Sequence, residues 1–173
     1  MSEQDALHQL NVWGGQPLPI SASCWLQGQL YVRLSGAQAA VDAAIKTIGG
    51  NDVAEPERFW DDVREQTHAF FSESEQPLWR LSVPTVAPPL ALPGEQMVEW
   101  GGAQRWLKTS AEAASIRAAA TAAGGHATLY KGGDKSVGVF QPLAPAVARI
   151  HRNLKNAFDP AGIFNPRRMY TDF

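Results

Sequence analysis

A proline-rich passage in the middle of the chain constrains the fold most. Four of the ten residues from 84 to 93 are proline, namely Pro84, Pro88, Pro89 and Pro93. Proline lacks a backbone N–H and clashes with the preceding helical turn, so the passage can be neither a central strand nor a long helix. Its apolar residues Val86, Leu90 and Leu92 can anchor it to a core. We therefore predict an ordered crossover between two strands.

Alternating apolar residues predict the strands on both sides of this crossover. Before it, Trp79, Leu81 and Val83 fall on one face of a strand and Arg80 on the other. After it, residues 97–108 read as a hairpin around two glycines. A second hairpin is predicted over 21–34, and a single strand over 126–130.

Helical spacing of apolar residues predicts the remaining elements. It is weak over 5–12 and clearer after Ser35, near Pro56, after Thr109 and from Pro145 to Phe158. Ser35 and Thr109 read as helix N-caps. Because strands and helices do not alternate strictly, we predict an α+β fold, an antiparallel sheet with helices packed on one face. The predicted organisation is an N-terminal helix and lead-in (1–20), an α+β domain (21–141), and a C-terminal helix and tail (142–173).

Composition excludes several classes of protein. A net charge of −2 gives no reason to expect binding to nucleic acid or an anionic membrane. The single cysteine, Cys24, cannot form an internal disulfide framework or a cysteine-based metal cluster, and the four histidines have no metal-ligand spacing. No apolar run is long enough for a membrane span, and the N-terminus does not read as a signal peptide. We expect a cytoplasmic protein without a metal site.

The C-terminal residues 154–170 carry the most specific pattern. A lysine-bearing helix runs into Phe158-Asp159-Pro160, then Gly162-Ile163, Asn165-Pro166 and paired arginines. This resembles the closing signature of FAD-linked oxidases of the vanillyl-alcohol oxidase type. Further stretches resemble the C-terminal half of the FAD-binding subunits of bacterial glycolate oxidases; they lie at 10–19, 30–36, 78–84, 99–107 and 125–130.

The resemblance implies a ferredoxin-like cap domain and a complete enzyme that oxidises glycolate to glyoxylate with FAD. It also implies that a flavin-binding domain, absent from this chain, precedes this half, so no FAD is expected on this chain alone. Its implied partners are a second flavin subunit and an iron–sulfur subunit, which would bring the protein to the inner face of a membrane. At Arg167 the chain departs from the glycine that the family favours. If that position needs a positive φ, arginine disturbs it.

Three residues are candidates for facing the substrate. Arg80 and Arg105 lie on predicted strands beside tryptophans, and a guanidinium suits a carboxylate. His126 begins a strand and could act as a base. The alternatives are that each arginine pairs with a surface acid or stacks on a tryptophan, and that His126 caps the preceding helix end or hydrogen-bonds a loop.

The resemblance alone assigns Asn165, Pro166 and Arg168 as cofactor-facing. The alternative is a tail that packs on its own domain.

Two functions stay open: the cap half of an FAD-dependent 2-hydroxy-acid oxidase, inactive by itself, or a non-catalytic interaction module that self-associates or binds another subunit. Which 2-hydroxy acid is oxidised, and whether the subunit is catalytic or supporting, also stay open.

Overall fold

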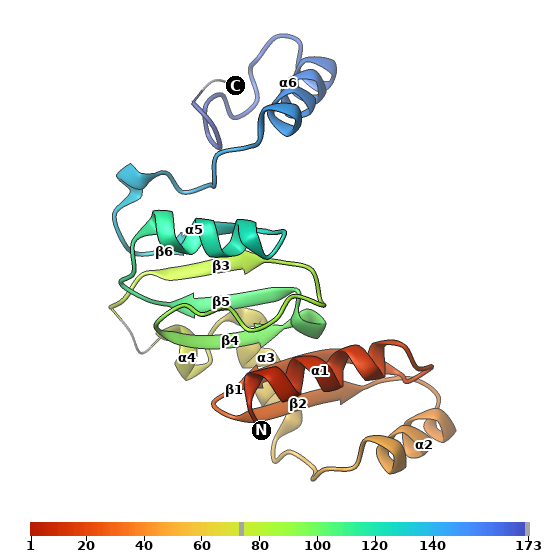
Figure 1. Cartoon of the computed structure of the whole chain (residues 1–173). Coiled ribbons are helices and arrows are strands. Elements are labelled where there is room, and N and C mark those ends of the chain that lie inside the picture. Colours follow the sequence, from red (N-terminus) through yellow and green to blue (C-terminus); the bar gives the residue numbers. More distant parts are fainter. Residues whose placement is uncertain (73–74, 172–173) are drawn as a thin grey trace.

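The computed structural model describes residues 1–72 and 75–171 and is built on one antiparallel sheet (Figure 1). The strand order is β2-β1-β4-β5-β3-β6. The bounds of the strands are β1 Ile20–Leu26, β2 Gln29–Leu34, β3 Leu78–Ser82, β4 Glu95–Glu99, β5 Gln104–Lys108 and β6 His126–Lys131. Both predicted hairpins are confirmed, since β1 pairs with β2 and β4 with β5.

Within the described part of the chain, six α-helices and two short 3-10 turns connect and flank the strands. Their bounds are α1 Glu3–Gly14, α2 Gln38–Ile48, α3 Pro56–Glu65, α4 Ala69–Ser72, α5 Ala113–Ala122, α6 Pro145–Phe158, η1 Trp100–Gly102 and η2 Lys135–Val137. The two predicted N-caps are wrong, because α2 and α5 start from Ala37 and Glu112 without a side-chain cap. The helix α5 buries Ile116 and Ala120 in the core, whereas α2 buries only Ala44. Within the described residues, no helix is long and apolar enough to cross a membrane.

The strands β3 to β6 follow the β-crossover-β-β-α-β connection of a ferredoxin-like unit. Their order in the sheet is β4-β5-β3-β6, with every neighbouring pair antiparallel. The proline-rich crossover stands where the first helix of such a unit would be, and α5 is the second helix. The hairpin β1–β2 extends this sheet beyond β4. The predicted α+β class with an antiparallel sheet is confirmed.

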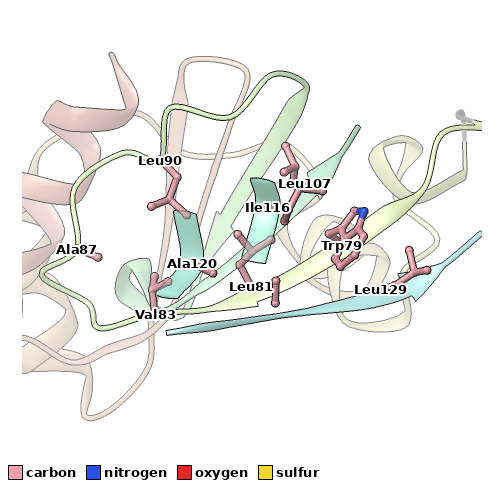
Figure 2. Packing of buried hydrophobic residues seen from close by; sticks show 10 residues of the cluster. Trp79, Leu81, Val83, Ala87, Leu90, Leu107, Ile116, Ala120 and Leu129 are labelled. Atoms are coloured by element: carbon pink, nitrogen blue, oxygen red, sulfur yellow. The ribbon is translucent and has the colours of Figure 1, made fainter. Parts of the chain in front are cut away.

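The face of the sheet that we call the α5 face carries the first core. Trp79, Leu81, Leu107 and Leu129 pack there against the helix α5, as Figure 2 shows. The crossover adds Ala87 and Leu90 to the same cluster. The predicted role of the passage 84–93 as an anchored crossover is therefore confirmed.

The opposite face, which we call the α3 face, carries a second core. Met97 and Trp106 of the sheet pack there against residues of α3 and α4. The ring of Phe71 meets Trp106 edge-on, with centroids 5.4 Å apart. The expected placement of helices on one face is thus corrected, because the aromatic residues of α3 and α4 need their own apolar surface. Cys24 is buried in this core, and burial raises the pKa of its thiol, which keeps it unreactive.

The helix α6 and the tail after it stand apart from the sheet (Figure 1). Although α6 is strongly amphipathic, none of its residues is buried. Its apolar stripe is exposed, with accessible fractions of 41% for Val147, 62% for Ile150, 56% for Leu154 and 80% for Phe158. A stripe of this size on one helix is unusual for a surface that only meets water.

Candidate functional site

Arg105 is enclosed on the α5 face, where it ties three segments together. Only 1% of the residue is accessible. Its guanidinium donates to the carbonyl oxygens of Gly102 (3.1 Å), Pro88 (2.6 Å) and Ala87 (2.6 Å), and Nη1 lies 3.7 Å from Glu3 Oε1. These contacts hold the crossover, the turn η1 and the helix α1 to the sheet. This geometry favours a structural role for Arg105 over contact with a substrate carboxylate.

Arg80 and His126 lie on the α3 face of adjacent strands. Arg80 is opposite Thr128 in the register of β3 and β6, and His126 is opposite Ser82. The two candidates are therefore diagonal neighbours on one face, about 7–8 Å apart by the usual spacing. The guanidinium of Arg80 sits 5.9 Å from the ring centroid of Tyr130, and His126 is exposed. The structure brings these two candidates together and separates them from Arg105.

A cleft lies beside the hairpin β1–β2, and we call it the aromatic cleft. Its volume is about 640 Å³. It opens between the end of α1, the hairpin, α3 and the turn η1, and its most distinctive walls are Trp13, Trp60, Trp100, Arg33, Arg64 and Glu99. None of the three substrate-facing candidates lines it.

Glu99 is the half-buried acid of the aromatic cleft. Its Oε2 accepts hydrogen bonds from Trp106 Nε1 (2.5 Å) and Gln104 Nε2 (3.2 Å). Burial raises the pKa of Glu99 even though both of these hydrogen bonds act to lower it. A carboxyl group with a raised pKa in a cleft can exchange a proton with a ligand, which is chemistry typical of a functional site.

Trp100 forms the outer wall of the cleft in a strained conformation. Its φ is +53°, a region that non-glycine residues rarely adopt, and 69% of the residue is accessible. The next residue fixes the turn, since the N–H of Gly101 donates to Ser23 Oγ (2.9 Å). Strain held in place by surrounding contacts is commoner at binding sites than elsewhere.

The sequence interpretation missed Arg33 and Glu99. The available signals were weak: Arg33 lies on the strand face opposite to Leu30, Val32 and Leu34, and Glu99 precedes the Trp-Gly-Gly turn. Across residues 1–72 and 75–171, no three His, Cys, Asp or Glu side chains gather where they could hold a metal ion.

The tail folds back along α6 around the carboxylate of Asp159. This group accepts from the N–H groups of Ile163 (3.1 Å) and Phe164 (2.9 Å) and pairs with Lys155 Nζ. Lys155 also donates to the carbonyl of Phe164. The predicted helix end at Asp159-Pro160 is confirmed, and the Asp159 side chain sets the path of the tail beyond it.

Two of the three cofactor-facing candidates lie together. Asn165 and Arg168 line a groove of about 480 Å³ between α6 and the tail, with Leu154 and Phe158 on its apolar side. Pro166 lies between them in sequence and is exposed. Arg167 has a φ of +58°, the left-handed region that favours glycine. The resemblance favours glycine at this position, and the side chain of Arg167 therefore adds backbone strain there.

We expect the change Asp159→Ala to release the tail. Loss of the shared acceptor should speed hydrogen exchange of the Ile163 and Phe164 amides by about tenfold or more, because charge-assisted hydrogen bonds protect both. Exchange measured by NMR checks this. Asp134→Ala removes a similar acceptor at η2 and should leave both tail amides unchanged. Equal exchange in the Asp159 variant and the parent chain would show that the tail is held by other contacts.

The same contacts give the tail a pH dependence. The hydrogen bond from Lys155, with those from the two amides, holds the pKa of Asp159 below its usual value of 3.8. A lowered folded-state pKa means that the carboxylate stabilises the tail above the usual aspartate range. That stabilisation is lost as the pH falls through the lowered pKa.

One comparison identifies a relative of the chain. No protein-family profile matches it, and no solved structure matches it. The "Glycolate oxidase subunit GlcE" of Escherichia coli (strain K12) is 46% identical over 172 residues, covering 99% of this chain and 47% of the relative. The chain spans about half the length of this relative and matches its C-terminal half. The resemblance predicted from the sequence is confirmed.

Proposed function

We propose that this chain, which matches the C-terminal half of a glycolate oxidase subunit, works as the cap half of an FAD-dependent enzyme that oxidises glycolate or a related 2-hydroxy acid. The observation that carries the proposal is identity of 46% over nearly the whole chain. The aligned region covers 99% of this chain and so includes the strands and the tail. The cap half is inactive by itself and contributes its sheet and tail to a site completed by the rest of the protein.

The residues at the tail fit a contact with the cofactor, though they do not enclose one. The groove between α6 and the tail offers the Asn165 amide and the Arg168 guanidinium beside apolar carbon from Leu154 and Phe158. A cation and an amide next to an apolar wall suit a ligand that combines phosphates with a flat ring system. When bound, FAD supplies the acceptor for the hydride that leaves the hydroxyl-bearing carbon of the substrate. Asn165, Pro166 and Arg168 would hold the cofactor's edge.

Arg80 and His126 are the substrate-facing residues in this proposal. Their positions on adjacent strands of one face would let a guanidinium bind a carboxylate while an imidazole meets the neighbouring hydroxyl group. Arg105 contributes indirectly, by holding the crossover in place. A second flavin subunit and an iron–sulfur subunit are the proposed partners of the assembled enzyme.

The exposed stripe of α6 supports a contact with the other half of the protein. Val147, Ile150, Leu154 and Phe158 present continuous apolar surface on a helix without a buried residue. The match covers 47% of the relative's length. The rest of the relative is a region of comparable size, and a counterpart of that region would cover this stripe. The same stripe favours a second candidate function, a non-catalytic module that binds a separate subunit or a second copy of this chain.

A chimera tests the proposed function. The C-terminal half of Escherichia coli GlcE is replaced by this chain, and glycolate-dependent reduction of an electron-acceptor dye is measured in cells that make the other enzyme subunits. We expect the chimera to restore the activity. The isolated 173-residue chain is the control and should show neither bound flavin nor turnover. A stable but inactive chimera would contradict the proposed function.

The stripe is tested in the same chimera. Leu154→Ser together with Phe158→Ser should lower the activity by about tenfold or more, since each lost apolar contact weakens the association. Val86 is an exposed apolar residue outside the stripe and is 75% accessible. Val86→Ser should therefore leave the activity of the chimera unchanged. An active double variant that has lost binding to a separate subunit would instead favour the interaction module.

A further inference from the structure

The aromatic cleft places a basic and an acidic side chain on either side of one strand. Arg33 of β2 pairs with Ala22 of β1, while Glu99 of β4 pairs with Cys24, two residues further along β1. The two backbones are therefore two strand spacings apart, about 10 Å. All three of Arg33, Ala22 and Glu99 line the cleft. The small side chain of Ala22 leaves the space between the charged groups free.

Arg33 has unused hydrogen-bonding capacity. Its Nε donates to Ser21 Oγ (2.9 Å), and its guanidinium lies 5.7 Å from the ring centroid of Trp60. Within residues 1–72 and 75–171, no carboxylate pairs with it and its terminal nitrogens make no hydrogen bond. The cation–π contact with the indole does not use these terminal nitrogens, so they are available to a bidentate anion.

Arg64, the second arginine of the cleft, is already paired. It contacts Asp61 Oδ1 (3.1 Å) and Glu65 Oε1 (2.7 Å) on its own helix. Arg33 is therefore the cation available to a ligand.

Glu99 offers one free oxygen on the other side. Both donors from Gln104 and Trp106 meet Oε2, and Oε1 receives no hydrogen bond from the described residues. Because burial raises its pKa, Glu99 can either accept a hydrogen bond from a hydroxyl group or, when protonated, donate one to a carbonyl oxygen.

We propose that the aromatic cleft binds a small carboxylic acid that carries a hydroxyl or carbonyl oxygen on the next carbon. The carboxylate pairs with Arg33, the neighbouring oxygen meets Glu99 Oε1, and Trp60 and Trp100 form the walls. The inference rests on the proposed function for its choice of ligand class. It assigns to that class a site separate from Arg80 and His126.

The test uses the 173-residue chain and the fluorescence of its tryptophans, three of which line the cleft. The ligands are glycolate, glyoxylate and acetate, the last of which lacks the second oxygen. We expect saturable binding with a dissociation constant on the order of 1 mM for glycolate, and weaker binding of acetate. Arg33→Gln should weaken binding of all three ligands by about tenfold. Glu99→Ala should bring the glycolate affinity down to that of acetate and leave acetate unchanged.

Two further variants separate a binding site from a folding effect. Ala22→Leu fills the space between Arg33 and Glu99 and should abolish binding while the near-ultraviolet circular dichroism stays native. Arg58→Gln removes an exposed guanidinium from the outer face of α3 and should bind like the parent chain. A parent chain that shows no saturable binding, or an Arg33 variant that binds normally, overturns the proposal.

The two proposals fail separately. If the chain binds none of the ligands while the GlcE chimera oxidises glycolate, only the cleft assignment is overturned. If binding is observed while the chimera is inactive, the cleft stands as a carboxylate site and the proposed function is overturned.

Discussion

Replacing Arg105 with methionine is expected to destabilise the chain by about 3–5 kcal/mol, because the change removes one partner from a buried polar network. Methionine keeps much of the apolar stem. The carbonyl oxygens of Gly102, Pro88 and Ala87 would lose their donors at once. Urea unfolding followed by circular dichroism measures the loss.

The loss of stability in the Arg105 variant should depend on pH, because the substitution also changes the pKa of Glu3. Burial raises the pKa of Glu3, and Arg105 is the group that opposes this rise. A raised folded-state pKa gives a stability contribution that is present below the unfolded value of 4.5 and is lost as the pH rises through the folded value. Without Arg105 the folded pKa rises further. The variant should therefore be least impaired at acidic pH and most impaired near neutrality.

Arg58→Met is the matched control for this result. Arg58 lies on the surface of α3 with 75% of its side chain accessible, and its ion pairs are exposed. We expect a change within about 0.5 kcal/mol. Similar destabilisation by both substitutions would mean that the enclosed hydrogen bonds of Arg105 add nothing special to the fold.

Gly125→Ala is expected to destabilise the chain by about 3 kcal/mol, at the upper end of overpacking effects. An added Cβ would lie 2.0 Å from the carbonyl oxygen of Ser82 and 2.8 Å from Val83 Cγ1. The first of these atoms belongs to the backbone at the end of β3, so relieving the clash requires β6 to move away from β3. Thermal and urea unfolding would both report it.

Gly14→Ala provides the opposite expectation from the same chemical change. Gly14 is the last residue of α1, and an added Cβ would meet no atom within 4 Å. Alanine should stabilise the helix by about 0.5–1 kcal/mol. If Gly125→Ala is as stable as the parent chain, the close approach of β6 to β3 at this point is not a feature of the folded protein.

The strands and the hairpins could be predicted because their signals are local. Alternation around Trp79 and Leu81, and the glycine turn before β5, depend only on neighbours in the sequence. The helix ends at Ser35 and Thr109 were predicted from capping residues and were wrong. The helices start instead at Gln38 and Ala113, after Ala37 and Glu112, neither of which makes a side-chain cap.

The candidate site residues also divide into features that local sequence predicts and features that distant contacts decide. Arg80, Arg105 and His126 were selected because they are polar residues on predicted strands. Nothing local distinguishes Arg105, whose partners come from the crossover and α1, from Arg80, whose guanidinium lies beside Tyr130. Burial and pairing are set by distant segments, so the role of each arginine could not be predicted from its neighbours.

By itself the sequence determined the α+β class, the crossover and the relationship carried by the tail, because each of these is written in a short run of residues. Only the tertiary structure decided that helices cover both faces of the sheet, and that Arg33 and Glu99 face one cleft. The physical reason is that strand order is set by long-range pairing. Here β1 lies between β2 and β4, and this pairing brings a guanidinium and a carboxyl group from distant parts of the chain to opposite sides of Ala22.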